Sequence, residues 1–298
     1  MVQRKQKIDL LGGSVLVMFS GLLGLNQVLV KLVNAGLQPT FQVGLRSACA
    51  ILPIIVFALI TRKKLTIYDG SFWPGIVAGL LFTAEFVLLF QSLEYTSVSR
   101  VSILFYAMPL WVTLGAHFLI PEERLTRLRI VGLILAIAGV AIALSDNAKP
   151  VSELAWLGDL MSLAAGVLWA GILLVTRKTK LSSATPEMTL IYQLCVSALL
   201  LLAISPLFGD VIREITPAIM GIFAFQVLIV VCIGFVAWFW VLSVYPASDM
   251  ASFGFLAPLF GVFFGWLILD EHITLRFVGA LVFVCVGIVL VNRKPAHS

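Results

Sequence analysis

The most regular feature of the sequence is a series of long apolar runs separated by short polar segments. A helix needs about 20 mostly apolar residues to cross the ~30 Å hydrocarbon core of a bilayer. Backbone groups in lipid must find partners within their own segment, so runs of this length predict helices rather than strands. We predict ten spans: Leu10–Val33, Phe41–Ile60, Phe72–Leu93, Val98–Leu119, Leu128–Ser145, Trp156–Thr176, Glu187–Phe208, Pro217–Ser243, Ala247–Leu269 and Leu275–Val291.

The composition agrees with an all-α membrane protein. Of the 298 residues, 61% are apolar and 12% are charged, and the mean hydropathy is +1.08. Soluble domains are close to half apolar and a quarter charged, which excludes an ordinary soluble enzyme, a disordered tail and a small secreted scaffold. The first run is too long for a signal peptide and lacks a small-residue cleavage site, so we expect a retained helix.

The positions of Lys and Arg predict the orientation of the spans. With the N-terminus inside, the inner segments hold fourteen of the 20 basic residues and the outer segments hold four. Cytoplasmic loops are enriched in Lys and Arg. We therefore expect a multi-pass protein of the bacterial inner membrane with both termini in the cytoplasm. The same bias accounts for the net charge of +5, so we expect no nucleic-acid partner.

The two halves of the chain resemble each other. In the first half, Pro109 and the Leu after it are followed by a Glu-x-aliphatic-Thr motif and then by an Arg-x-Val-Gly motif. The same order recurs from Pro258 in the second half. We divide the chain into a first repeat, 1–148, and a second, 149–298. Five helices per repeat put the halves in opposite orientations, and such inverted repeats build secondary transporters with a central site. A duplication kept only for packing is the alternative.

These motifs resemble the EamA-type branch of the drug/metabolite transporter superfamily over nearly the whole chain. Arg46 matches an arginine of that branch, and Gln193 stands at the corresponding place in the second half. Within the superfamily the sequence looks most like bacterial exporters of aromatic amino acids and methionine (the YddG type). The resemblance implies a ten-helix inner-membrane exporter with a central cavity.

Few ionisable residues lie inside the predicted spans, and such residues usually face a cavity or a partner. At ~1.5 Å per residue, Arg46, Asn26 and Glu85 lie roughly 8 to 12 Å from the outer ends of their helices. Arg46 and Glu85 either neutralise each other or contact the carboxylate and ammonium of an amino-acid solute. We expect Lys31 and Asp159 to reach water at the outer interface.

Mixed small, polar and aromatic helix faces predict a pocket between helices. Together with the polar groups above, the candidate solute-binding residues are Asn26, Arg46, Phe82, Glu85, Phe86, Tyr106, Trp169, Gln226, Phe235 and Trp238. The alternative for each aromatic residue is a lipid-facing or interfacial position.

Two prolines occupy equivalent positions in the fourth and ninth spans. Pro109 and Pro258 each remove a backbone donor and crowd the carbonyl four residues earlier. A bend results, and it is either a hinge for alternating access or a static kink.

Several classes of function lack their motifs. We find no P-loop, no HExxH, no dinucleotide fingerprint and no defensible catalytic triad, so we predict no enzyme activity, no cofactor and no metal. We expect a monomeric carrier of an amino-acid-like solute that works by facilitated or secondary active transport. The alternatives are a nucleotide-sugar or drug carrier, and a membrane-embedded enzyme or scaffold.

Overall fold

A computed structural model describes residues 8–120, 125–146, 152–245 and 253–292. Within these ranges the helices are α1 (Leu10–Asn34), α2 (Pro39–Ile60), α3 (Phe72–Tyr95), α4 (Val98–Tyr106), α5 (Met108–Leu119), α6 (Arg127–Leu144), α7 (Ala155–Lys178), α8 (Pro186–Ile204), α9 (Pro217–Phe225), α10 (Gly234–Val244), α12 (Leu256–Leu269) and α13 (Leu275–Asn292). Short 3₁₀ turns, η1 (Lys180–Ser183) and η2 (Ser205–Phe208), flank α8, and a π-helical segment, η3 (Gln226–Ile233), joins α9 to α10.

The predicted all-α membrane fold is confirmed. Nine helical stretches in the described residues are long and apolar enough to cross a bilayer, and α12 is a shorter apolar helix. The start of the ninth predicted span, Ala247–Leu269, falls partly outside the described residues. The helices begin where local chemistry favours it: Pro39, Pro186 and Pro217 occupy first-turn positions, where a missing N–H costs little.

Two predicted spans are interrupted. The span Val98–Leu119 is interrupted at Ala107, between α4 and α5, two residues before Pro109. The span Pro217–Ser243 contains the π-helical segment η3 between α9 and α10. Hydropathy detects neither change, because an interrupted helix and a continuous helix are equally apolar.

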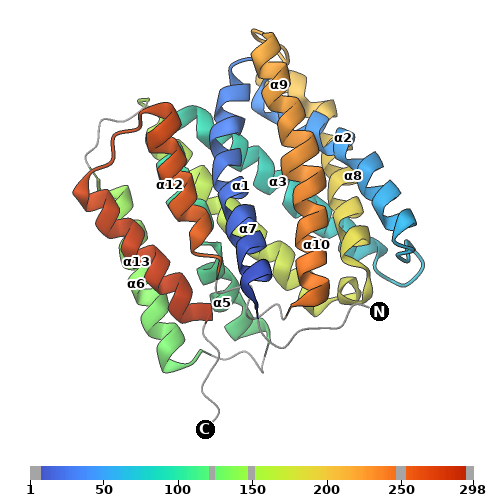
Figure 1. Ribbon diagram of the computed structural model, residues 1–298, viewed down its shortest axis with the longest axis horizontal. Helices are drawn as coiled ribbons and strands as arrows, with labels where there is room; N and C mark the ends of the chain where they lie inside the picture. The colour runs from blue at the N-terminus through green and yellow to red at the C-terminus, as the bar shows by residue number, and fades with distance from the viewer. Residues whose placement is uncertain (1–7, 121–124, 147–151, 246–252, 293–298) are drawn as a thin grey trace.

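Helices from the two halves pack in pairs (Figure 1). At the left of the view α6 lies against α13, at the right α2 lies against α8, and α1 packs on α12 near the centre. The start of α1 and the end of α13 lie at the same, lower end of the molecule. By the distribution of Lys and Arg, we refer to this end as the inner end and to the opposite one as the outer end.

The contact between α6 and α13 is symmetric. A Cβ on Gly132 would lie 2.9 Å from the carbonyl oxygen of Gly287, and a Cβ on Gly139 would lie 2.7 Å from that of Ala280. At the offset of 148 that relates Glu123 to Glu271, Gly132 corresponds to Ala280 and Gly139 to Gly287, one residue away from the offset of the Arg-x-Val-Gly motif. Exchanging the two halves therefore converts one contact into the other, as expected for helices that approach closely through small residues.

Candidate functional site

Arg46 lies deep inside the bundle and forms no ion pair with a described residue. The side chain belongs to α2 and is only 6% exposed. Its guanidinium carbon lies 4.7 Å from the ring centroid of Phe90 and 5.0 Å from that of Phe86, both on α3. Within the described part of the chain, no carboxylate lies within ion-pair distance of Arg46. Aromatic faces therefore hold the guanidinium in place by cation–π attraction and do not neutralise its charge.

Glu85 is the acidic residue that interacts electrostatically with Arg46. It lies on α3, is 1% exposed, and interacts electrostatically with Arg46. The two side chains nevertheless form no ion pair, and no hydrogen-bond donor among the described residues reaches Glu85 Oε2. Of the two predicted arrangements, direct neutralisation is therefore not the one that the structure contains. A buried acid without a donor is costly unless a ligand, a proton or water satisfies it.

Further polar atoms without partners lie on α1 and α4. Asn26 Oδ1 and Gln27 Oε1 accept no hydrogen bond from any described residue, and the hydroxyl of Ser102 is also unpaired. The Tyr106 hydroxyl lies beside the Gln27 side chain. α1 and α4 therefore present hydrogen-bonding capacity that the described residues do not use.

Aromatic side chains line up along α3. The ring centroids of Phe82 and Phe86 are 4.4 Å apart, and those of Phe86 and Phe90 are 5.7 Å apart. Tyr106 from α4 and Trp169 from α7 belong to the same apolar cluster as Phe86 and Phe90. The structure thus brings together four of the predicted aromatic residues and places the Arg46 guanidinium on their edge.

The candidates on the eighth span are divided between three places. Gln226 is fully buried and its Oε1 accepts a hydrogen bond of 3.1 Å from Gln42, which precedes Arg46 by one turn of α2. Phe235 packs instead beside Ile51 and Ile191, and Trp238 stacks on Phe19 with ring centroids 5.1 Å apart. The wider i→i+5 turns of η3 change the direction of successive side chains, so a regular helical period does not predict where the later residues point.

Sequence reasoning missed two residues near this region. Gln42 lies four residues before Arg46 and therefore on the same face of α2, a spacing that could have identified it. Trp111 on α5 has a buried indole N–H without a described acceptor, and its ring lies 3.7 Å from a Cβ built on Gly166. Trp111 follows the interruption at Ala107, and the sequence pattern does not reveal the geometry of that interruption.

Both prolines lie at the start of a helix. Pro109 is in the first turn of α5, directly after the break, and Pro258 is in the first turn of α12. The carbonyl oxygen of Phe105, four residues before Pro109, lies 3.0 Å from a Cβ built on Gly166 of α7. The helix is interrupted between Tyr106 and Met108, next to Pro109, and Gly166 leaves room for the carbonyl oxygen of Phe105.

At the outer end the charged groups are paired. Arg100 Nη2 and Asp159 Oδ2 are 2.6 Å apart, and the Thr96 hydroxyl donates to Asp159 Oδ1 at 2.8 Å. Asp159 is 3% exposed, so the prediction that it reaches water is wrong. Its carboxylate is paired with Arg100 instead of being hydrated. Lys31 donates to the carbonyl oxygen of Thr96 at 2.6 Å.

A second acidic group at the outer end caps a helix. Glu271 accepts hydrogen bonds from the backbone N–H groups of Val98 and Ser99 at 2.7 and 2.8 Å, and from the Ser99 hydroxyl at 2.6 Å. These are unsatisfied donors of the first turn of α4, where a negative charge is stabilising. The repeated Glu of the sequence motif thus fastens the second half to the first. Its counterpart, Glu123, lies outside the described residues.

Two pockets open near the ends of the bundle. One of about 740 Å³ includes Arg100, Asp159 and Glu271 at the outer end. One of about 340 Å³ lies at the inner end between α2 and α8. Neither is lined by Arg46 or Glu85, so the central cavity stays a prediction.

Comparison with known proteins identifies the family of this architecture. The model of the EamA-like transporter family matches residues 11–145 and 156–293. The uncharacterized transporter YoaV of Bacillus subtilis is 28% identical over 267 residues, 89% of this chain and 91% of that protein. A probable amino-acid metabolite efflux pump of Escherichia coli is 25% identical over 267 residues, 87% of each chain. A solved crystal structure with 18% identity superposes with a TM-score of 0.67 over 95% of this chain, which shows a shared fold.

Proposed function

The chain belongs to the EamA-like transporter family, and from that premise we propose that it exports amino acids or related small metabolites across the bacterial inner membrane. Among amino acids we propose aromatic or hydrophobic ones and methionine as the solutes. The observation that carries this proposal is the pair Arg46 and Glu85, two buried ionisable groups that interact electrostatically without forming an ion pair. Ionisable groups inside a membrane commonly mark the path of a solute.

The chemistry of the site matches a zwitterion with an apolar side chain. In our proposal the solute carboxylate binds Arg46, which presents a planar set of donors suited to that group. The solute ammonium approaches Glu85, and Asn26 and Gln226 supply further polar contacts. The side chain packs against Phe82, Phe86, Tyr106 and Trp169, since aromatic and apolar surfaces commonly line small-molecule sites. Phe235 and Trp238 pack in two other clusters and would contact solute only after a rearrangement.

Transport requires the site to face each side in turn, and we propose that the two halves, 1–148 and 149–298, move relative to each other. Inverted repeats provide two related arrangements of this kind. Pro109 and Pro258 are the proposed flexible points, because each lies where a span is interrupted or begins. In the described structure the outer ends of α4 and α7 are joined by Arg100 and Asp159, so access from that side would require this pair to separate.

The proposed orientation places both termini in the cytoplasm, and the proposed unit of function is the monomer, since both halves of the site come from one chain. The transmembrane orientation is supported by the excess of Lys and Arg at the inner end.

Counterflow in proteoliposomes tests the proposed activity. Vesicles loaded with one unlabelled amino acid are diluted into the labelled compound, for each of the twenty amino acids, with and without a pH gradient. We expect saturable uptake for aromatic amino acids and methionine, and unmodified solute inside the vesicles. Empty vesicles and a Glu85→Gln variant are the controls. Absence of saturable exchange for every amino acid would contradict the proposed solute class, and chemical conversion would contradict carriage.

A further inference from the structure

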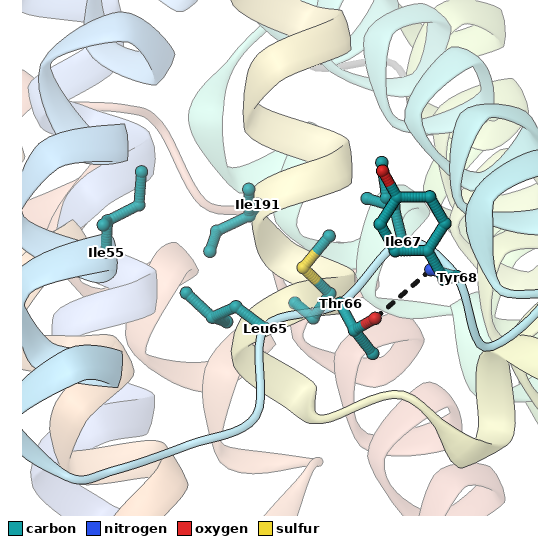
Figure 2. A pocket seen from close by; sticks show the side chains of 7 residues that line it. Ile55, Leu65, Thr66, Ile67, Tyr68 and Ile191 are labelled. Atoms are coloured by element: carbon teal, nitrogen blue, oxygen red, sulfur yellow. Dashed lines mark hydrogen bonds between the residues drawn. The ribbon is translucent and has the colours of Figure 1, made fainter.

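A small apolar pocket lies at the inner end of the bundle, far along α2 from Arg46. It occupies about 340 Å³ between the end of α2, the segment 61–71 and the start of α8. Figure 2 shows Ile55 of α2 and Ile191 of α8 on either side of the space, with Leu65 of the connecting segment below them. Nothing in the proposed transport mechanism uses this pocket.

The helix surfaces beside the pocket face lipid. Leu52 and Leu59 on α2 are 68% and 64% exposed, and Leu199 on α8 is 74% exposed. Ile55 lies five residues before the end of α2, about 8 Å below the inner surface at the usual helical rise. The pocket therefore extends from the headgroup region into the depth that lipid acyl chains occupy.

Basic residues directly precede the segment that lines the pocket, which begins at Leu65. Arg62, Lys63 and Lys64 follow α2 directly. Lys180 approaches the same segment, since its Cδ lies 2.6 Å from a Cβ built on Gly70. Basic pockets between transmembrane helices on the cytoplasmic side recognise anionic lipid headgroups.

Two acidic groups reduce but do not cancel this charge. Glu187 pairs with Lys63 at 3.6 Å. Asp69 faces Lys64, and hydrogen bonds from Ser71, together with that lysine, hold the pKa of the Asp69 carboxyl below its usual range. With four cations against two carboxylates, this group of residues keeps a positive excess, and Arg62 has no described counter-ion.

The backbone at Arg62 supplies an independent observation. Its φ is +52°, in the left-handed region, where it ends α2: the Arg62 N–H donates to Leu59 O and the Lys63 N–H donates to Ala58 O at 2.8 Å. Glycine adopts this helix-terminating conformation without steric cost and is the usual residue there. An arginine is strained in this place, which points to a use for its side chain.

We propose that this pocket binds one anionic phospholipid, with an acyl chain between Ile55 and Ile191 and the headgroup phosphate at Arg62 and Lys64. The apolar lining suits an acyl chain and the charge excess suits an anionic headgroup. Arg62 lies between the end of α2 and the lining segment that begins at Leu65. Lys63 contributes less to headgroup binding, because it already forms an ion pair with Glu187.

Native mass spectrometry can measure the site on the full chain, released from vesicles of equal phosphatidylglycerol and phosphatidylcholine. We expect the wild type to retain one phosphatidylglycerol in preference to phosphatidylcholine. Each removed cation should reduce that retention about fivefold, so Arg62→Gln with Lys64→Gln should nearly abolish the preference. Arg127→Gln, on the exposed inner end of α6, is the matched control and should leave it unchanged.

Two further variants separate binding from folding. Arg62→Gly should raise the Tm of the purified protein, because it relieves the left-handed backbone, and should still lower phosphatidylglycerol retention. Ile191→Trp should fill the pocket and reduce retention, whereas Leu199→Trp, on the lipid-facing side of α8, should not. Equal retention of both lipids by the wild type would overturn the proposal, as would unchanged retention in the Arg62 and Lys64 double variant.

Discussion

The outer end of α4 and the middle of α3 use acidic side chains in opposite ways. At the outer end, Asp159 holds Arg100 and Thr96, and Glu271 accepts three hydrogen bonds. In the middle, Glu85 is at least as deeply buried and its Oε2 has no described donor. Satisfied charges join helices and specify the fold, whereas a buried carboxyl group without a hydrogen-bond partner lowers stability. The difference supports our proposal that Glu85 serves a ligand rather than the fold.

The largest expected effect on stability belongs to the outer end. Asp159→Asn removes the carboxylate that Arg100 and Thr96 share, and breaking such a buried pair costs about 3 kcal/mol. The loss should appear as a lower midpoint of unfolding in a denaturant titration of the purified protein. Asp159→Glu is the control, because it keeps the charge. An unchanged midpoint for Asp159→Asn would show that the Asp159 carboxylate does not stabilise the fold, and would contradict the contrast with Glu85.

Glu85→Gln should have the reverse profile. The neutral amide is cheaper to bury, so the free energy of unfolding should stay the same or rise. Transport of an amino acid should fall about 30-fold, which corresponds to loss of ~2 kcal/mol from a charge-assisted contact. The measurement is the initial rate of counterflow at equal amounts of folded protein. A destabilised variant with wild-type transport would show that Glu85 is structural.

A smaller effect is expected where Arg46 rests on aromatic rings. Phe86→Leu keeps the apolar volume approximately and removes one of the two faces under the guanidinium. Cation–π contacts contribute about 1 kcal/mol, so the apparent affinity for solute should fall about fivefold. Competition against labelled solute measures this shift. Phe82→Leu, one turn away on the same helix, is the matched control and should change affinity less.

The smallest effect is expected at the break between α4 and α5. Pro109→Ala restores a backbone donor and favours a continuous helix, which changes conformational preference by about 0.4–1 kcal/mol. We expect a two- to fivefold slower turnover with unchanged solute affinity, measured by single-turnover exchange. Pro258→Ala should behave alike, since it occupies the equivalent position. Wild-type turnover in both variants would identify the prolines as static kinks.

Hydropathy alone predicted where the described helices lie, because lipid allows few other structures for long apolar runs. It did not predict the break at Ala107 or the π-helical segment at Gln226, since both depend on local backbone geometry. Periodicity along α3 placed Phe82, Glu85 and Phe86 on one face correctly. Periodicity gave no information about α2, which packs opposite. It therefore could not show that the rings of Phe86 and Phe90 contact Arg46, or that Glu85 forms no ion pair with Arg46.

The sequence also did not predict which residues far apart in the chain contact each other. The repeat identified Glu271 as a recurrent residue, but its role depends on Val98 and Ser99, more than 170 residues earlier in the chain. We expected Asp159 to reach water because the sequence gives its approximate depth in the helix. The sequence does not show that Arg100 of another helix approaches Asp159. Tertiary contacts of this kind depend on how helices cross, which apolar patterns do not determine.

A thermodynamic cycle between protein charge and solute charge tests the central claim most directly. Affinities are measured for the best solute of the counterflow panel and for its analogue lacking the carboxylate, with wild type and with Arg46→Gln. If Arg46 binds that carboxylate, the wild type prefers the complete solute and Arg46→Gln binds both compounds equally, a coupling of about 1–3 kcal/mol. An undiminished preference in Arg46→Gln would contradict the assignment of the buried charges to the solute.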